Sequence, residues 1–167
     1  KTQVQADIIS FNAAISACEK GAEWEWSLAL LAGLGTAGLA PDIVSYNAAI
    51  SACEKGNEWQ WSLHLLHIAR SDSATPDVIT TNAAISACEK GSQWSSALAL
   101  LCSMAVPPTN VTYNAAISAC ARGEQWRWAL ELLRRMPRAE VNPDLVGFNA
   151  SIFACERGSR WDKALLL

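Results

Sequence analysis

The sequence predicts an all-α protein in which helical hairpins of about 35 residues stack into a right-handed α-solenoid. Nearly the same phrase occurs five times, and its asparagines, used as phase markers, are spaced by 35, 35, 32 and 35 residues: Asn12, Asn47, Asn82, Asn114 and Asn149. Apolar residues in each copy recur at helical spacing. In such a solenoid each unit contacts only its neighbours, so one position of the repeat is presented again along a continuous surface.

Each repeat contains the signals of two helices. In the first full unit, residues 8–42, Asp7 is a candidate N-cap for a helix that ends at Gly21, and the small residues within it permit close approach of the next helix. A second amphipathic helix begins near Trp24 and is expected to end at the glycines before Pro41. Together they form one hairpin.

The repeat phase divides the chain into six segments. These are 1–7 as the end of a preceding repeat or a linker, then repeats 8–42, 43–77, 78–109, 110–144 and the truncated 145–167. The third repeat is three residues short between Met104 and Pro108, which we expect to tilt the next unit. Both chain ends look cut, so we expect further repeats of a longer array and a targeting segment outside this chain.

Composition excludes several classes of protein. A net charge of -3 with 51% apolar residues excludes a disordered polyelectrolyte and gives no overall basic signal for nucleic acid. No segment reaches the roughly 18 to 20 apolar residues of a membrane span. Five of the six cysteines share one column, where neighbouring copies are too far apart for disulfides, and they are predicted to be small buried hydrophobes: Cys18, Cys53, Cys88, Cys120 and Cys155. A reducing compartment follows.

Tryptophan forms a further column, which we expect to be the main anchor between repeats because each indole buries a large area. Its members are Trp24, Trp59, Trp94, Trp126 and Trp161. A partial second column, Trp26, Trp61 and Trp128, is expected to be more exposed because Ser96 and Lys163 replace it elsewhere. His64 and His67 lack partners of metal-binding type and are interpreted as surface residues.

At these residues the pattern resembles the pentatricopeptide repeat family, with repeats like those of its P type. The matching features are the 35-residue period, the Pro-Asp-x-x-(Ser/Thr)-(Tyr/Phe)-Asn opening at 41–47 with near variants at 76–82 and 143–149, and the Lys-Gly turn. The Trp-x-x-Leu-Gly-x-x-Tyr opening of tetratricopeptide repeats is absent. The resemblance covers essentially the whole chain.

This resemblance implies sequence-selective binding of single-stranded RNA, one base per repeat, in organellar RNA processing or stability. In the family the fifth residue of the first helix and the last residue of the repeat together choose the base. The pairs here are Asn12 with Asp42, Asn47 with Asp77, Asn82 with Thr109 and Asn114 with Asp144, while the partner of Asn149 lies beyond the last residue. By the family's correspondence Asn with Asp favours uridine, which predicts the register U-U-(pyrimidine)-U.

Two more columns have family roles. The resemblance implies that the β-branched second position sandwiches the bases: Ile9, Val44, Ile79, Val111 and Val146. The thirteenth position is basic in every copy and is implied to face phosphate: Lys20, Lys55, Lys90, Arg122 and Arg157. A column that stays basic within an acidic chain is also the best local evidence for a polyanion track.

Each column has an alternative interpretation. The asparagines can form an internal hydrogen-bond ladder, the aspartates cap helices whatever else they do, and the cations complement the negative end of a helix dipole. At the level of function, the alternative to an RNA binder is a protein- or peptide-binding α-solenoid scaffold.

No enzyme function is predicted. The sequence lacks the His-x-Glu and Pro-Cys-x-x-Cys pattern of a deaminase, an acidic nuclease cluster and a Gly-rich phosphate loop. We therefore expect no catalytic residues, no metal, no cofactor, no small-molecule substrate and no membrane partner. The alga-like phrase Asn-Ala-Ala-Ile-Ser-Ala-Cys favours a chloroplast, with a mitochondrion as the alternative compartment.

Overall fold

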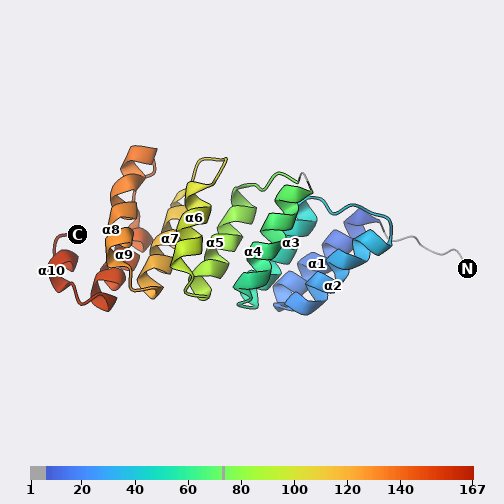
Figure 1. Cartoon of the computed structure of the whole chain (residues 1–167), viewed down its shortest axis with the longest axis horizontal. Coiled ribbons are helices and arrows are strands. Elements are labelled where there is room, and N and C mark those ends of the chain that lie inside the picture. The colour runs from blue at the N-terminus through green and yellow to red at the C-terminus, as the bar shows by residue number, and fades with distance from the viewer. Residues whose placement is uncertain (1–6, 73) are drawn as a thin grey trace, which may run out of the picture. The chain divides into compact units, whose positions relative to one another are not determined.

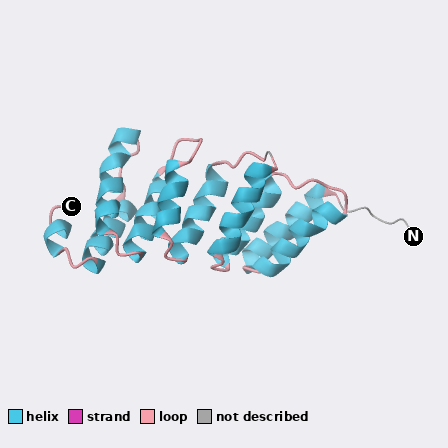
Figure 2. Ribbon diagram, in the orientation of Figure 1, coloured by secondary structure: helices cyan, strands magenta, loops and turns pink. Residues whose placement is uncertain are grey.

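The computed structural model describes residues 7–72 and 74–167. In this part of the chain all the secondary-structure elements are helices, joined by short turns and loops, as Figures 1 and 2 show. The elements are α1 (Ile8–Gly21), α2 (Trp24–Thr36), α3 (Ile43–Lys55), α4 (Trp59–Ser71), α5 (Val78–Lys90), α6 (Trp94–Cys102), α7 (Asn110–Arg122), α8 (Trp126–Arg135), the 3-10 helix η1 (Met136–Ala139), α9 (Leu145–Arg157) and α10 (Trp161–Ala164). The all-α prediction and the succession of helical hairpins are confirmed. The predicted segment 1–7 lies, except for Asp7, outside the described residues.

The chain forms two compact units, with the boundary after Ala87, inside α5. In the first unit α1 packs against its hairpin partner α2 and against α3, and α3 packs against α4. In the second unit α7 packs against α6, α8 and α9, and α9 packs against α10. Within each unit, therefore, the first helices of neighbouring hairpins lie side by side.

Small side chains allow these first helices to approach one another. Ala49 and Ala52 of α3 and Ala116 and Ala119 of α7 are fully buried. Larger apolar side chains from both helices of a hairpin complete each core: Ile15, Leu34, Tyr46, Ile50 and Leu66 in the first unit, and Ile117, Leu132, Leu133 and Met136 in the second. The predicted role of the alanine-rich run is thus seen directly.

The first helices begin at the predicted caps. The carboxylates of Asp7, Asp42 and Asp144 accept hydrogen bonds from backbone N–H groups three residues later, and Thr109 has the same place before α7. A cap of this kind contributes about 1 kcal/mol because it satisfies an amide that has no partner within the helix. Because of these starts, the asparagine is the fifth residue of every first helix.

The tryptophan column joins neighbouring hairpins through the glycine that follows the next first helix. The contacts of this kind within the described units are Trp24 with Gly56, Trp94 with Gly123 and Trp126 with Gly158. A Cβ atom at Gly123 would lie only 2.3 Å from Cδ1 of Trp94. The expected anchoring role of these tryptophans is therefore observed, while Trp161, in the last hairpin, is exposed.

The left-handed residue of each turn is not this glycine but the residue after it. Gly123 has φ −84°, whereas the positive φ angles belong to Ala22, Asn57, Ser92, Glu124 and Ser159. A side chain in the left-handed region is strained, which is why glycine is favoured there. Packing against a tryptophan, and not backbone geometry, is therefore what requires glycine at Gly56, Gly123 and Gly158.

Ala22→Gly is expected to stabilise the chain by about 0.5 to 1 kcal/mol, since relief of left-handed strain exceeds the entropy that glycine adds to the unfolded state. The midpoint of urea unfolding measures this. Ala37→Gly is the matched control, because Ala37 follows α2 with φ −82° and has no such strain to lose. Equal effects of the two substitutions would show that the strain is absent.

The predicted end of the second helix of the first repeat is confirmed. Helix α2 runs through Gly33 and Gly35 to Thr36, and Gly38 follows with φ +73°. A Cβ at Gly33 would lie 3.3 Å from the ring of Phe11, so the missing side chain lets α1 and α2 pack closely there. Packing between the two helices overrides the weak helix propensity of glycine.

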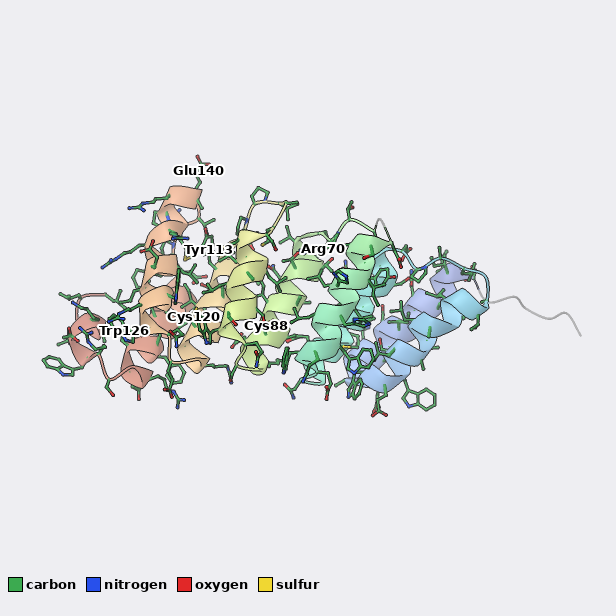
Figure 3. The ribbon with its side chains drawn as sticks, viewed as in Figure 1. Arg70, Cys88, Tyr113, Cys120, Trp126 and Glu140 are labelled. Atoms are coloured by element: carbon green, nitrogen blue, oxygen red, sulfur yellow. The ribbon has the colours of Figure 1, made fainter. Side chains whose placement is uncertain are left out.

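Most predictions for the cysteines, for the second tryptophan column and for the two histidines also hold. Cys53, Cys88, Cys120 and Cys155 are buried, Cys18 is partly buried, and all six cysteines are free; Figure 3 labels Cys88 and Cys120. Burial raises the pKa of the Cys88 thiol to about 11. Trp26, Trp61 and Trp128 are exposed, as are His64 and His67. None of the helices in the described part is long and apolar enough to span a membrane.

Candidate functional site

The structure brings the asparagine of one repeat together with the aspartate before the next. The Nδ2 group of Asn12 donates to Asp42 Oδ1 at 3.1 Å. The equivalent distances are 3.3 Å from Asn47 Nδ2 to Asp77 Oδ2 and 3.0 Å from Asn114 Nδ2 to Asp144 Oδ1. Residues 30 positions apart thus form one repeated pair, because the aspartate that caps a first helix lies beside the asparagine of the preceding one.

Each aspartate of these pairs is held in its ionised form. Burial raises the pKa of Asp42, but hydrogen bonds from the backbone and hydroxyl of Ser45 and from Asn12 together lower it below the ordinary value. At Asp144 the backbone N–H of Gly147 is the main cause of a lowered pKa. An ionised carboxylate can only accept hydrogen bonds, so it fixes which end of the asparagine amide faces it.

The asparagine side chains lie at the edge of the core, where solvent still reaches them. Asn12, Asn47, Asn82 and Asn114 are partly buried and Asn149 is exposed. Beside them the β-branched column is solvent-exposed in every copy: Ile9 by 73%, Val44 by 51%, Ile79 by 64%, Val111 by 60% and Val146 by 57%. A repeated exposed apolar side chain next to a tethered amide is a surface on which a flat, hydrogen-bonding ligand can lie.

The basic column lies at the other end of the first helices and is paired with acids of the preceding hairpin. Lys55 Nζ lies 2.9 Å from Glu19 Oε1, and Arg157 donates to Glu124 Oε1 at 3.0 Å. Arg122 Nε lies 3.3 Å from Glu89 Oε1. All five cations, Lys20, Lys55, Lys90, Arg122 and Arg157, are exposed, so a polyanion can reach them but must compete with carboxylates.

A hollow of about 450 Å³ opens beside two of these cations in the second unit. Arg122, Arg157, Ser118 and Phe153 are among the residues that line it. Phe153 is 45% exposed and stands where the other repeats have serine. The hollow is open, with cations and one aromatic ring on its wall.

The remaining predicted site residues are not brought together within one unit. Asn82 belongs to the first unit and Thr109 to the second, where Thr109 caps α7. The described residues contain no group of His, Cys, Asp or Glu arranged to hold a metal ion.

Two sets of side chains at the site were not singled out from the sequence. One is the third residue of the first helix: the hydroxyl of Ser45 donates to Asn12 Oδ1 at 2.6 Å, and Thr80 donates to Asn47 Oδ1 in the same way. The other is the set of carboxylates that pair with Lys55, Arg122 and Arg157. The recurring Ser or Thr of the repeat opening was visible in the sequence, but its contact with an asparagine 33 residues earlier was not.

Comparison with known proteins identifies the repeat type and the fold. A family model described as the PPR repeat matches residues 111–141. The fold is similar to the crystal structure of the pentatricopeptide repeat protein PPR10 from maize, with a TM-score of 0.81 and 22% identity over 95% of this chain and 23% of that chain. Residues 111–141 thus match a pentatricopeptide repeat, and the chain has the fold of pentatricopeptide repeat proteins. The predicted resemblance is confirmed.

Other pentatricopeptide repeat structures agree with this assignment. A PPR10 variant in complex with an 18-nt psaJ RNA element has a TM-score of 0.80 and 25% identity, over 99% of this chain and 25% of that chain. The PPR domain of protein-only RNase P 1 from Arabidopsis thaliana, in complex with tRNA, has a TM-score of 0.77 and 16% identity, over 91% of this chain and 82% of that domain. The chain thus spans about a quarter of PPR10. Among curated proteins, no sequence matches it.

Proposed function

We propose that this pentatricopeptide repeat chain binds single-stranded RNA, one base per repeat, with a preference for uridine-rich RNA. The observation that carries the proposal is the repeated pair of a half-buried asparagine and an ionised aspartate beside an exposed β-branched residue. The RNA complexes of PPR10 and of the RNase P domain support the same class of ligand. The predicted register is U-U-(pyrimidine)-U.

The residue roles follow from hydrogen-bonding capacity. An asparagine amide offers a donor and an acceptor to a pyrimidine edge, and the aspartate orients that amide or accepts from the base directly or through water. The β-branched residues supply stiff apolar surfaces on which the bases stack. Asn82 with Thr109 is expected to discriminate least, since a hydroxyl both donates and accepts.

The cation column is proposed to bind phosphate by exchanging partners. Lys55 and Arg157 are exposed and already paired with carboxylates, and exposed ion pairs of this type contribute only about 0 to 1 kcal/mol. A phosphate offers comparable contacts and releases counterions from the RNA. The existing pairs therefore weaken the phosphate contacts without preventing them. With four base-reading pairs, this chain is expected to bind RNA weakly.

The experiment is an exchange of the base-reading pair. Asn47→Thr together with Asp77→Asn is expected to shift the second base from uridine to adenosine, the family's other pairing. Competition binding with RNAs that differ at that base alone measures the shift. Preferences at the bases assigned to Asn12 and Asn114 serve as internal controls.

An unchanged preference at the second base would contradict base reading by this pair. The alternative function, a protein- or peptide-binding scaffold, predicts neither a uridine preference nor a steep loss of affinity with added salt. Binding that is insensitive to salt and to base identity would favour that scaffold.

We also propose a role in organellar RNA processing or stability. The chloroplast is the proposed compartment, and the mitochondrion is the alternative. The alga-like repeat phrase and the plant origin of the similar structures, maize and Arabidopsis thaliana, support this compartment. The proposed roles are binding roles, and none of the residues above is assigned a chemical step. Targeting of a full-length protein to isolated chloroplasts tests the compartment.

A further inference from the structure

We propose that the third residue of a first helix, represented by Ser45 and Thr80, fixes the orientation of the asparagine amide in the preceding repeat and thereby separates uridine from cytidine. The inference rests on the proposed RNA-binding function and names a positioning residue for it. The asparagine and aspartate favour uridine, and the hydroxyl behind them strengthens the discrimination against cytidine.

The hydrogen bonds around Ser45 leave one destination for its proton. Its Oγ accepts from the backbone N–H of Asp42 at 3.3 Å. It lies 2.6 Å from Asn12 Oδ1 and 2.9 Å from Asp42 Oδ1, and a hydroxyl has a single proton to donate. Asp42 Oδ1 already accepts the backbone N–H of Ser45 at 2.8 Å, so the shorter contact, to the otherwise unshared asparagine oxygen, takes the proton.

The same arrangement recurs one repeat later. Thr80 accepts from the backbone N–H of Asp77 at 3.2 Å and donates to Asn47 Oδ1. Asn47 Nδ2 meanwhile donates to the Asp77 carboxylate. Both ends of the amide are thus assigned, and both hydroxyl residues are fully buried, so water does not replace them.

A fixed amide reads one pyrimidine. After these two bonds the asparagine amide has one N–H and one oxygen lone pair left for a base. The positions of this donor and acceptor cannot be exchanged, because turning the amide over would point its oxygen at an ionised carboxylate. Uracil presents an acceptor oxygen beside its N3–H, and cytosine presents the reverse, a donor amino group beside an acceptor N3. An amide that could turn over would match both edges.

The fifth repeat provides a natural contrast. Gly147 stands at the third position, and no hydroxyl reaches Asn114, whose Oδ1 is buried without a hydrogen-bond partner among the described residues. Only the carboxylate of Asp144 orients this amide. We therefore expect weaker discrimination between uridine and cytidine at the base assigned to Asn114 than at those assigned to Asn12 and Asn47.

The test compares uridine with cytidine at one base at a time, using the whole 167-residue chain. Thr80→Val keeps the shape of the side chain and removes the hydroxyl, and the uridine-over-cytidine ratio at the base of Asn47 is expected to fall about fivefold, the typical value of one neutral hydrogen bond. Ratios at the other bases should stay constant, and Thr80→Ser should restore the wild-type ratio. Ser62→Ala is the matched control, because its hydroxyl is buried and makes no hydrogen bond.

Gly147→Ser supplies the opposite change. A Cβ at this position would lie 2.8 Å from Asn114 Oδ1, the movable end of a side chain, and only in ordinary contact with Leu133 and Asp144. The added hydroxyl is expected to raise the uridine-over-cytidine ratio at the base of Asn114. Unchanged ratios in this variant and in folded Thr80→Val would overturn the proposal, and Gly147→Ser decides it alone if Thr80→Val does not fold.

Failure of the proposed function is distinguishable from failure of this inference. If the wild-type chain shows no preference for uridine RNA, the function is wrong, and the orienting contact is judged without RNA from the side-chain amide NMR signals of Asn47. A change of these signals in Thr80→Val with recovery in Thr80→Ser supports the contact. Signals that are identical in all three proteins overturn it.

Discussion

Gly123→Ala is expected to destabilise the chain by about 1 to 3 kcal/mol, the range for an over-packed core site. The added methyl would lie 2.3 Å from Cδ1 and 2.8 Å from Cγ of Trp94, closer than carbon atoms can approach. The backbone gives no reason for a loss, since Gly123 has φ −84° and ψ 8°, which alanine adopts readily. The loss therefore measures the contact between a tryptophan and the next hairpin.

Two comparisons isolate that contact. Gly35→Ala is the matched control: it lies inside α2, an added Cβ meets nothing within 4 Å, and alanine is the better helix former, so a gain of about 0.5 to 1 kcal/mol is expected. In a Trp94→Ala background Gly123→Ala should cost little, which a double-mutant cycle in urea detects. A loss that persists without the indole would show that the glycine is needed for another reason.

The triple substitution Lys55→Ala, Arg122→Ala and Arg157→Ala is expected to weaken the binding of all RNA sequences alike. If each cation contacts one phosphate, the slope of log affinity against log salt should fall by about 2, at about 0.7 per contact with a single strand. Removal of the cations also takes a positive charge away from Glu19, Glu89 and Glu124, whose carboxylates then repel the RNA phosphates more strongly. Titrations of uridine-rich and purine RNA at several salt concentrations measure both effects.

A charge-matched control is available on other parts of the chain. Arg70, Arg134 and Arg138 are exposed residues of the second helices and of η1, and their joint replacement by alanine should leave the salt slope nearly unchanged. Glu19→Gln with Glu89→Gln and Glu124→Gln should act in the opposite direction, raising affinity by releasing the cations. A loss of affinity confined to uridine-rich strands in the triple cation variant would contradict the phosphate role.

Much of the fold could be predicted because its signals are local. Asp7 and Asp42 mark helix starts by residue type alone, and the repeat period places every later hairpin by analogy with the first. The sequence did not reveal why α2 tolerates Gly33 in its interior, which is that Phe11 of α1 packs against this glycine. Local propensity is decisive only where no neighbouring helix intervenes.

The candidate site was predictable as columns but not as contacts. The asparagine, β-branched and basic columns are visible in the sequence, and family resemblance suggested that asparagine and aspartate act together. Neither source indicated that Ser45 donates to Asn12 or that Glu19 pairs with Lys55. These partners are separated by 33 and 36 residues, and what joins them is the packing of one first helix on the next.

By itself the sequence determined the period, the helix starts, the apolar faces and the repetition of each chemical group, since these depend on residues close together in the chain. Tertiary structure alone decided that a turn glycine is required by a tryptophan of the preceding hairpin. It also decided that the cations of the basic column, Lys20 excepted, have interactions of their own among the described residues. Finally, it placed a buried hydroxyl against an amide that is proposed to read a base. The physical reason is that short-range forces act between surfaces, and helix packing determines which surfaces meet.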